Sequence, residues 1–285
     1  MPPFQIDPRM HMGAVTLAVA DLLKLSAFYQ QIIGLKMLTE NEGEVVLGVA
    51  PARPLVRLLA RPYGQSFPRR PGLFHLAILV PDRPALGQWI NHLAQSGYQL
   101  DGAGDHLVSE ALYLSDPEGN GIEIYADRPR ESWPYRDGKL LMDTLAVDIP
   151  ALQQVARSEP FSGLPPETIM GHVHLRVSEV AQAVAFYRDV LGIPYITDFP
   201  GAGFLGAGGY HHHIGLNAWH SRRAEAPPAD ALGLVNLQIV LPDEEALGAV
   251  RNSLDEHGVD IREVEEGLVA ADPDQNHVLL SVRVE

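Results

Sequence analysis

The sequence has no cysteine, no long hydrophobic run and no excess of positive charge. Without cysteine, disulfides, thiolate catalysis and zinc sites built on sulfur are excluded. No stretch approaches the roughly 20 apolar residues of a membrane helix, and the N-terminal residues contain no basic-then-apolar signal segment. A net charge of -15 would repel phosphate backbones. We therefore expect a cytoplasmic protein that binds neither membranes nor nucleic acid.

An internal repeat is the main organising feature of the chain. Residues 13–37, GAVTLAVADLLKLSAFYQQIIGLKM, align without gaps on residues 171–195, GHVHLRVSEVAQAVAFYRDVLGIPY. Residues 72–87, GLFHLAILVPDRPALG, align in the same way on residues 233–248, GLVNLQIVLPDEEALG. Each segment is a strand followed by a helix, and in the second pair an aspartate is placed to cap that helix. With 285 residues, this pattern predicts two domains, each with its own core.

The repeat divides the chain into four modules, each with a strand, a helix and three more strands. Their bounds are roughly 11–62, 73–127, 170–221 and 233–285. The three-strand runs are predicted at 35–41, 43–50 and 55–61 in the first module and at 194–199, 202–207 and 210–219 in the third. We predict an α+β protein with a first domain at 1–128, a linker at 129–169 that contains a helix at 149–157, and a second domain at 170–285.

Three consecutive histidines, His211, His212 and His213, lie inside one of the predicted strands. Side chains alternate between the two faces of an extended segment, so His211 and His213 are expected on one face and His212 on the other. Imidazoles are good ligands for borderline divalent metals. The histidine run therefore indicates a metal site, although a hydrogen-bonded surface strand would also accommodate a single histidine.

Three segments carry a family resemblance: GHVHLRV and AFYRDVLG within 171–192, FHLAILVPD at 74–82, and DPEGNGIEIYADRP at 116–129. They resemble the vicinal oxygen chelate superfamily, which contains glyoxalase I, extradiol dioxygenases and bleomycin-resistance proteins. The layout is most similar to the four-module, catechol-2,3-dioxygenase-type members. The resemblance implies that the modules pair into half-open mixed β-barrels and that a pair of modules holds one divalent ion.

The resemblance also implies four metal ligands. His172 and His213 come from the first and last strands of the third module, and His75 and Glu123 from those of the second. The equivalent positions of the other two modules hold Ala14, Leu55 or Arg57, Asn236 and Leu279. Because the complete ligand set falls on the second and third modules, these two are expected to pair, which leaves the first and fourth modules without a metal site.

Nitrogen and oxygen ligands suit iron(II), and manganese, nickel or zinc are alternatives. Two histidines and a carboxylate leave open positions on the metal, as in non-haem iron oxygenases. The resemblance of the layout to the catechol-2,3-dioxygenase-type members therefore implies an extradiol dioxygenase that acts on a catechol-like aromatic diol and dioxygen. If His213 is a fourth ligand, about two positions stay open on a six-coordinate ion, and this would favour a glyoxalase-type lyase or isomerase. A non-catalytic small-molecule binding or resistance protein is the third alternative.

Three further residues are candidates for catalysis. His174 shares a strand face with His172, and Tyr125 shares one with Glu123. His106 precedes a strand near the expected opening of the barrel. Each could donate a hydrogen bond or carry a proton, and each could equally be a packing or turn residue. The sequence leaves open whether the protein is a monomer or a homodimer.

Overall fold

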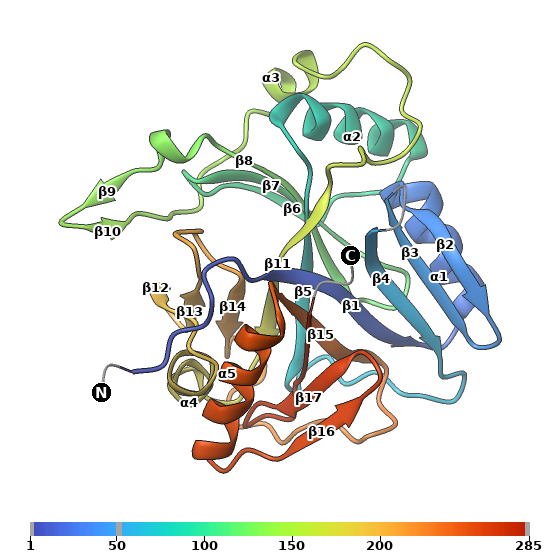
Figure 1. The fold of residues 1–285 in the computed structure, drawn as a ribbon. Coiled ribbons are helices and arrows are strands. Elements are labelled where there is room, and N and C mark those ends of the chain that lie inside the picture. The colour runs from blue at the N-terminus through green and yellow to red at the C-terminus, as the bar shows by residue number, and fades with distance from the viewer. Residues whose placement is uncertain (1–2, 50–52, 283–285) are drawn as a thin grey trace. The chain divides into compact units, whose positions relative to one another are not determined.

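The computed structural model describes residues 3–49 and 53–282, and Figure 1 shows the repeated order of strand, helix and strands. The last residue of the predicted run 43–50 and the last three of the module 233–285 lie outside the described residues. The first two modules comprise β1 (His11–Val19), α1 (Leu22–Phe28), β2 (Lys36–Asn41), β3 (Glu44–Val49), β4 (Arg53–Ala60), β5 (Gly72–Leu79), α2 (Arg83–Ser96), β6 (Gly102–Asp105), β7 (Ser109–Ser115) and β8 (Gly121–Asp127).

The linker and the last two modules follow in the same way. The linker contains a short hairpin, β9 (Tyr135–Arg136) and β10 (Lys139–Leu140), and the helix α3 (Ile149–Gln154). The last two modules comprise β11 (Ile169–Arg176), α4 (Val180–Ala185), β12 (Tyr195–Phe199), β13 (Ala202–Leu205), β14 (Ile214–Asn217), β15 (Gly233–Leu241), α5 (Glu244–Glu256), β16 (Ile261–Val264), β17 (Gly267–Ala271) and β18 (His277–Val282).

The strands form two eight-stranded sheets. One has the order β16-β17-β18-β15-β1-β4-β3-β2, and the other has the order β12-β13-β14-β11-β5-β8-β7-β6. Both sheets are mixed, because β15 pairs in parallel with β18 and β5 with β8, whereas β17–β18 and β7–β8 are antiparallel. The second sheet contains the strands of the second and third modules and the first sheet those of the other two. The predicted α+β class and the predicted pairing of modules are thus confirmed.

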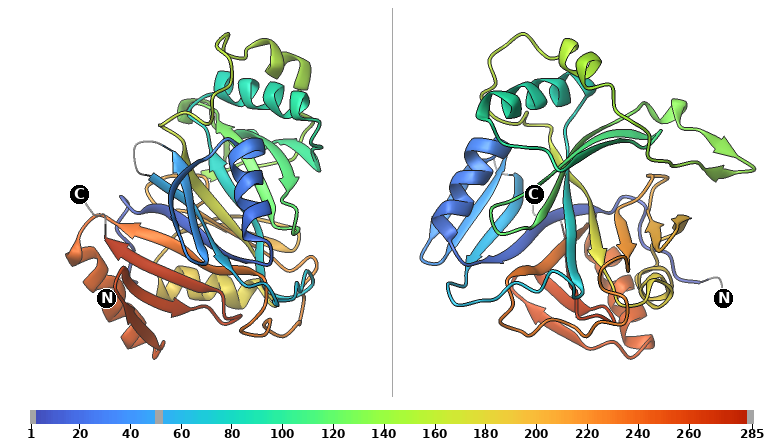
Figure 2. Two further views of the ribbon diagram at one scale, coloured as in Figure 1. Left: turned by 90° about the vertical axis from the view of Figure 1, so that its right-hand side faces the viewer. Right: turned by 180° about the vertical axis from the view of Figure 1, so that it is seen from behind.

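By its internal contacts the chain divides into two compact units. One consists of Met1–Leu17, Gln65–Phe74 and Gly171–Glu285, and the other of Ala18–Gly64 and His75–Met170. Within the first unit, α5 packs on β15 and β18, and Figure 2 shows this helix, in dark orange, beside the red strands that follow it. Within the second unit, α3 of the linker lies against α2 (Figure 1). The sequential domains at 1–128 and 170–285 stay a prediction.

Side-chain caps explain where the two long helices begin. Asp82 precedes α2, and its carboxylate accepts a hydrogen bond of 2.8 Å from the amide of Ala85. Asp243 precedes α5 and accepts one of 2.9 Å from Ala246. An aspartate at this position satisfies one of the free amide groups of the first helical turn. The capping role predicted from the Pro-Asp pattern is therefore confirmed.

A second recurring aspartate shapes the turn before the last strand of a module. The carboxylate of Asp116 accepts hydrogen bonds from the amides of Glu118 and Asn120, both at 2.9 Å, and from the Asn120 side chain at 2.8 Å. These bonds close the loop between β7 and β8, so the two strands pair with Ser115 opposite Gly121. The register of this hairpin determines which residue of β7 lies opposite Glu123.

Gly87 in α2 and Gly248 in α5 occupy the same position of the repeat but have different surroundings. A Cβ atom on Gly87 would overlap the carbonyl oxygen of Leu152 in α3, whereas a Cβ atom on Gly248 would meet nothing within 4 Å. We expect Gly87→Ala to lower the free energy of unfolding by about 1–3 kcal/mol. Gly248→Ala should raise it by about 0.5–1 kcal/mol, because alanine favours the helix.

Urea denaturation of both glycine variants beside the wild-type protein measures these changes. Two shifts of the same sign would contradict the close contact of α2 with α3.

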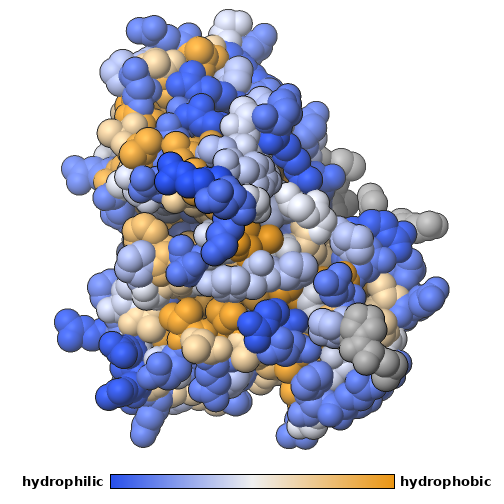
Figure 3. Space-filling model, turned by 90° about the vertical axis from the view of Figure 1, so that its left-hand side faces the viewer, coloured by the Kyte–Doolittle hydropathy of each residue, from blue (hydrophilic) through white to orange (hydrophobic). Residues whose placement is uncertain are grey.

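On the face in Figure 3, hydrophobic residues gather in a few patches among hydrophilic ones. Tyr63 and Leu23 are the most exposed large hydrophobic residues of the described ranges, and single exposures of this kind are normal for globular proteins. Along the described part of the chain, no helix combines the length and the hydrophobicity that a membrane crossing requires.

Candidate metal centre

His75 and Glu123 lie on adjacent parallel strands and form a buried pair. His75 is opposite Gly121, and Ala77 is opposite Glu123, so the two functional side chains project from the same face of the sheet. The Nε2 atom of His75 is 3.1 Å from a carboxylate oxygen of Glu123. His75 is 7% exposed and Glu123 is 2% exposed. A carboxylate buried to this degree is costly unless a positive charge or hydrogen-bond donors compensate it.

His172 of β11 completes a group of three candidate ligands. A nitrogen of His75, a carboxylate oxygen of Glu123 and a nitrogen of His172 all lie within 4.8 Å of one another, and all three residues are buried. Two imidazoles and a carboxylate fit a divalent ion such as iron(II), manganese, nickel or zinc, and three ligands leave positions open for substrate. Three of the four ligands predicted from the sequence therefore come together in one buried cluster.

Tyr113 of β7 is a member of this site that was not predicted from the sequence. It lies directly opposite Glu123 in the β7–β8 pairing, and its ring centre is 5.7 Å from that of His75. Burial and the nearby Glu123 carboxylate raise the pKa of the Tyr113 hydroxyl well above its usual value. The hydroxyl therefore keeps its proton at neutral pH and is a hydrogen-bond donor beside two candidate ligands.

His106, a predicted catalytic residue, contacts Tyr113. Its Nε2 atom is 2.6 Å from the Tyr113 hydroxyl oxygen, and its Nδ1 atom is 2.8 Å from the backbone carbonyl oxygen of Asp143 in the linker. A chain of close contacts therefore leads from the linker through His106 and Tyr113 to Glu123. The catalytic role of His106 stays a prediction, and the structure shows only its contact with Tyr113, the neighbour of two candidate ligands.

The other two predicted catalytic residues lie in apolar surroundings. His174 is buried and surrounded by aromatic rings, with ring centres 5.1 Å from Phe74 and 5.7 Å each from Phe204 and Trp219. Tyr125 is fully buried in a cluster with Ala77 and Ala111. Their surroundings suit packing, and for His174 they also suit contact with an aromatic molecule.

The histidine run is not extended, so the predicted alternation of its side chains is wrong. The strand β14 begins only at Ile214, after the three histidines. The Nδ1 atoms of the neighbouring residues His211 and His212 are 2.8 Å apart, and the ring centre of His212 is 4.1 Å from that of His172. Two close glycines, Gly208 and Gly209, both have positive φ angles and bend the chain before the run.

Among the described residues, the group of three candidate ligands does not include His213. Its Nδ1 atom accepts a hydrogen bond of 3.2 Å from the backbone amide of Ala207, and its ring centre is 4.9 Å from that of Tyr210. One nitrogen of the ring is thus engaged in holding the loop before β14. That His213 binds the metal ion stays a prediction. The position of its ring favours the alternative, in which His213 stabilises the site without binding the ion.

We expect His213→Ala to retain the metal ion and to lower the free energy of unfolding by about 1–3 kcal/mol, because the buried amide of Ala207 loses its acceptor. His213→Asn provides a carboxamide oxygen in its place and should recover part of that loss. Metal content by elemental analysis and urea denaturation measure the two effects. Loss of the metal ion from both variants would show that His213 is a ligand.

The comparisons with known proteins identify the family to which this fold and this cluster belong. The family model described as Glyoxalase/Bleomycin resistance protein/Dioxygenase superfamily matches residues 11–124 and again residues 169–278. The chain therefore belongs to this superfamily, which confirms the resemblance found in the sequence.

Individual relatives narrow the comparison. The chain is 44% identical over 268 residues to a catechol-2,3-dioxygenase of Bacillus subtilis (strain 168), a match that covers 92% of this chain and 94% of that protein. It is 27% identical over 170 residues to biphenyl-2,3-diol 1,2-dioxygenase 3 of Rhodococcus globerulus, covering 57% and 87%. The crystal structure of glyoxalase I from Zea mays matches with a TM-score of 0.58 over 95% of this chain and 92% of that one, and its 18% identity supports the fold alone.

Proposed function

We propose that the chain is an iron(II)-dependent extradiol dioxygenase that cleaves the ring of a catechol-like aromatic diol with dioxygen. The observation that carries this proposal is the buried cluster of His75, Glu123 and His172, whose donor atoms lie within 4.8 Å of one another. The relative of 44% identity, a catechol-2,3-dioxygenase, supports it. The cluster and this relative together favour a ring-cleaving dioxygenase over a glyoxalase-type isomerase and over a non-catalytic binding protein.

In this proposal His75, Glu123 and His172 hold the ion, with the Glu123 carboxylate supplying the only negative charge of the three. A bound iron(II) ion would bring a diol and dioxygen together and pass electron density between them. Three protein ligands are compatible with this role, because the diol needs two positions and dioxygen a third. The hydrogen bond between His213 and Ala207 fits a three-ligand site better than a four-ligand site.

The residues around the ligands have separate roles in the proposed reaction. The Tyr113 hydroxyl stays protonated, with its hydrogen toward Nε2 of His106, so its oxygen can accept a hydrogen bond from a hydroxyl of the substrate next to Glu123. His106 is the nearest group that can accept a proton through Tyr113, because its Nε2 atom lies 2.6 Å from that hydroxyl. His174 follows His172 on the same face, and the rings of Phe74 and Trp219 around it suit the flat apolar ring of a catechol.

Oxygen uptake by anaerobically iron-loaded protein tests the proposal. We expect uptake of one molecule of dioxygen per molecule of catechol or methylcatechol, with both oxygen atoms found in the ring-opened product by mass spectrometry. The zinc-loaded protein is the control, since zinc has no redox chemistry. Turnover of the thiol adduct of methylglyoxal without any oxygen uptake would overturn the proposal in favour of the isomerase. Tight binding of catechols with no turnover in any metal form would favour the binding protein.

A further inference from the structure

The turn that carries His106 has a strained backbone. Residues 106–108 join β6 to β7, and the backbone amide of His106 donates a hydrogen bond of 2.9 Å to the carbonyl of Ser109. Leu107 adopts a φ of +68°, in the left-handed region that a leucine rarely occupies. Its amide donates a hydrogen bond of 2.9 Å to a carboxylate oxygen of Asp105. The surroundings thus hold a conformation that the sequence of the turn does not favour by itself.

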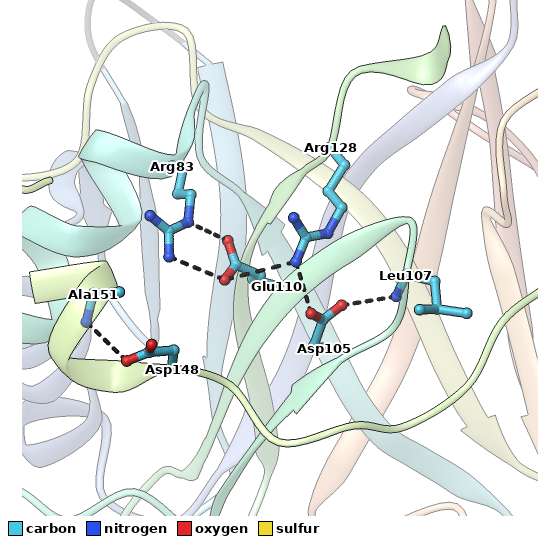
Figure 4. A network of polar contacts seen from close by, with 7 residues as sticks. All are labelled: Arg83, Asp105, Leu107, Glu110, Arg128, Asp148 and Ala151. Atoms are coloured by element: carbon cyan, nitrogen blue, oxygen red, sulfur yellow. Dashed lines mark hydrogen bonds and ion pairs between the residues drawn. The ribbon is translucent and has the colours of Figure 1, made fainter. Parts of the chain in front are cut away.

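A charged network anchors Asp105, as Figure 4 shows. The second carboxylate oxygen of Asp105 is 2.7 Å from a guanidinium nitrogen of Arg128. The same nitrogen is 3.8 Å from the carboxylate of Glu110, which is 5% exposed and also binds the guanidinium of Arg83. Two arginines therefore hold the carboxylate at the end of β6 and the carboxylate near the start of β7. This arrangement leaves the turn little freedom to change the position of His106.

The linker adds a second restraint through residues 143–145, here called the strap. The amide of Leu145 donates a hydrogen bond to the carbonyl of Asp105, and the amide of Asp105 donates one to the carbonyl of Leu145, both at 2.9 Å. This pair of bonds places the carbonyl of Asp143 2.8 Å from the Nδ1 atom of His106. The strap therefore touches the turn at its backbone and the histidine at its ring.

The strap has a chemical consequence for His106. A carbonyl oxygen can only accept a hydrogen bond, so the Nδ1 atom that faces Asp143 must carry a hydrogen. In the neutral ring the other nitrogen, Nε2, is then an acceptor, and it lies 2.6 Å from the hydroxyl of Tyr113. A backbone contact of this kind is a common way to select one tautomer of a functional histidine.

We propose that the strap fixes His106 in the tautomer with the hydrogen on Nδ1, so that Nε2 is held as the acceptor toward Tyr113. Leu145, through its backbone, and Gly104 are then positioning residues of the site. Gly104 has this role because a Cβ atom there would come within 2.9 Å of the His106 ring and 3.4 Å of Thr144. The effect on catalysis rests on the proposed dioxygenase function, whereas the tautomer itself does not.

Leu145→Pro removes one of the two bonds that hold the strap, because proline has no amide hydrogen. Leu145→Ala keeps that amide and is the matched control, since the Leu145 side chain is 48% exposed. Long-range proton–nitrogen NMR of the metal-free or zinc-loaded protein distinguishes the two tautomers, and a His106→Gln spectrum assigns the signals. We expect a hydrogen on Nδ1 alone in the wild-type protein and in Leu145→Ala, and a mixture of tautomers in Leu145→Pro.

Gly104→Ala is an independent test, because it moves the ring without changing the linker. Gly102→Ala lies on the same strand, where a Cβ atom would meet nothing within 4 Å, and is its control. We expect Gly104→Ala to give mixed tautomers and, in the iron-loaded enzyme, to lower kcat about tenfold with KM within about twofold. Gly102→Ala should match the wild-type protein in both measurements.

Two results would overturn the proposal. One is a wild-type spectrum with the hydrogen on Nε2, and the other is a single Nδ1-protonated form in both Leu145→Pro and Gly104→Ala. Absence of oxygen uptake with every catechol would refute the proposed function, yet the spectra would still decide whether the strap selects the tautomer.

Discussion

His75→Ala is expected to release the metal ion and to abolish ring cleavage, whereas Asn236→Ala leaves both unchanged. The two residues occupy the same position of the repeat, on β5 and on β15, but only His75 lies within 3.1 Å of a buried carboxylate. Loss of a residue that only supports a ligand costs about 10–100-fold in metal affinity, and loss of a direct ligand should cost more. We therefore expect a decrease in affinity of more than about 100-fold.

Elemental analysis after dialysis and metal titration of the apo-protein measure this change. Thermal unfolding in the presence of a chelator shows whether His75→Ala still folds. Full metal retention by this variant would contradict the proposed site, and an equal loss in Asn236→Ala would show that the effect belongs to the fold and not to the ligand.

Glu123→Gln tests the same cluster through its charge. Glutamine has the shape of glutamate but no negative charge, so it is a poor ligand and yet a less costly buried group. We expect the variant to lose the metal ion and to unfold, in chelator, at a temperature no lower than that of the wild-type protein. A large loss of stability without metal would instead indicate that the carboxylate holds the strands together.

The repeat made most of the fold predictable. Strand, helix and strands recur with matching hydrophobic positions, and the Pro-Asp pattern before α2 and α5 marks helix starts whose caps the structure confirms. Pairing of the second and third modules followed from the unequal distribution of ligands, since only those modules contain histidine and glutamate at the equivalent positions. The strand pattern and the helix starts are predictable because each depends on residues close together in the chain.

The site was only partly predictable. His75, Glu123 and His172 were predicted as ligands from the family resemblance, and they lie in one buried cluster. Tyr113 was missed, although the turn around Asp116 contains a signal for it: a hairpin closed with Ser115 opposite Gly121 places Tyr113 opposite Glu123. The register of the hairpin therefore specifies this tyrosine, whereas its residue type alone does not.

Two features were not predicted, and only the second had no signal in the sequence, because a Gly-Gly pair is itself a turn signal. The histidine run was predicted as a strand because its neighbours are apolar, but Gly208 and Gly209 with positive φ angles bend the chain before it. The contact between the carbonyl of Asp143 and His106 involves a backbone group 37 residues away, and neither residue type nor spacing specifies it. Long-range backbone contacts depend on how the linker packs, which a pattern in a single sequence does not describe.

Tyr113→Phe should lower kcat about 100-fold while the metal ion stays bound. The variant keeps the ring that packs beside His75 and removes only the hydroxyl, which lies next to Glu123 and 2.6 Å from His106. Because burial and Glu123 raise the pKa of this hydroxyl, it acts as a fixed donor and not as a base. Its removal therefore breaks the path of hydrogen bonds to His106 and leaves the charge of the ligands unchanged.

Tyr98→Phe is the matched control for this variant, since it removes a hydroxyl of the same module that donates a hydrogen bond to the carbonyl of Ser115, away from the ligands. Steady-state oxygen uptake gives kcat and KM, and elemental analysis gives the metal content. A drop in kcat with metal retained in Tyr113→Phe, and none in Tyr98→Phe, assigns the effect to the hydrogen-bonded chain. Equal activity of Tyr113→Phe and the wild-type enzyme would exclude Tyr113 and, with it, the route by which a proton reaches His106.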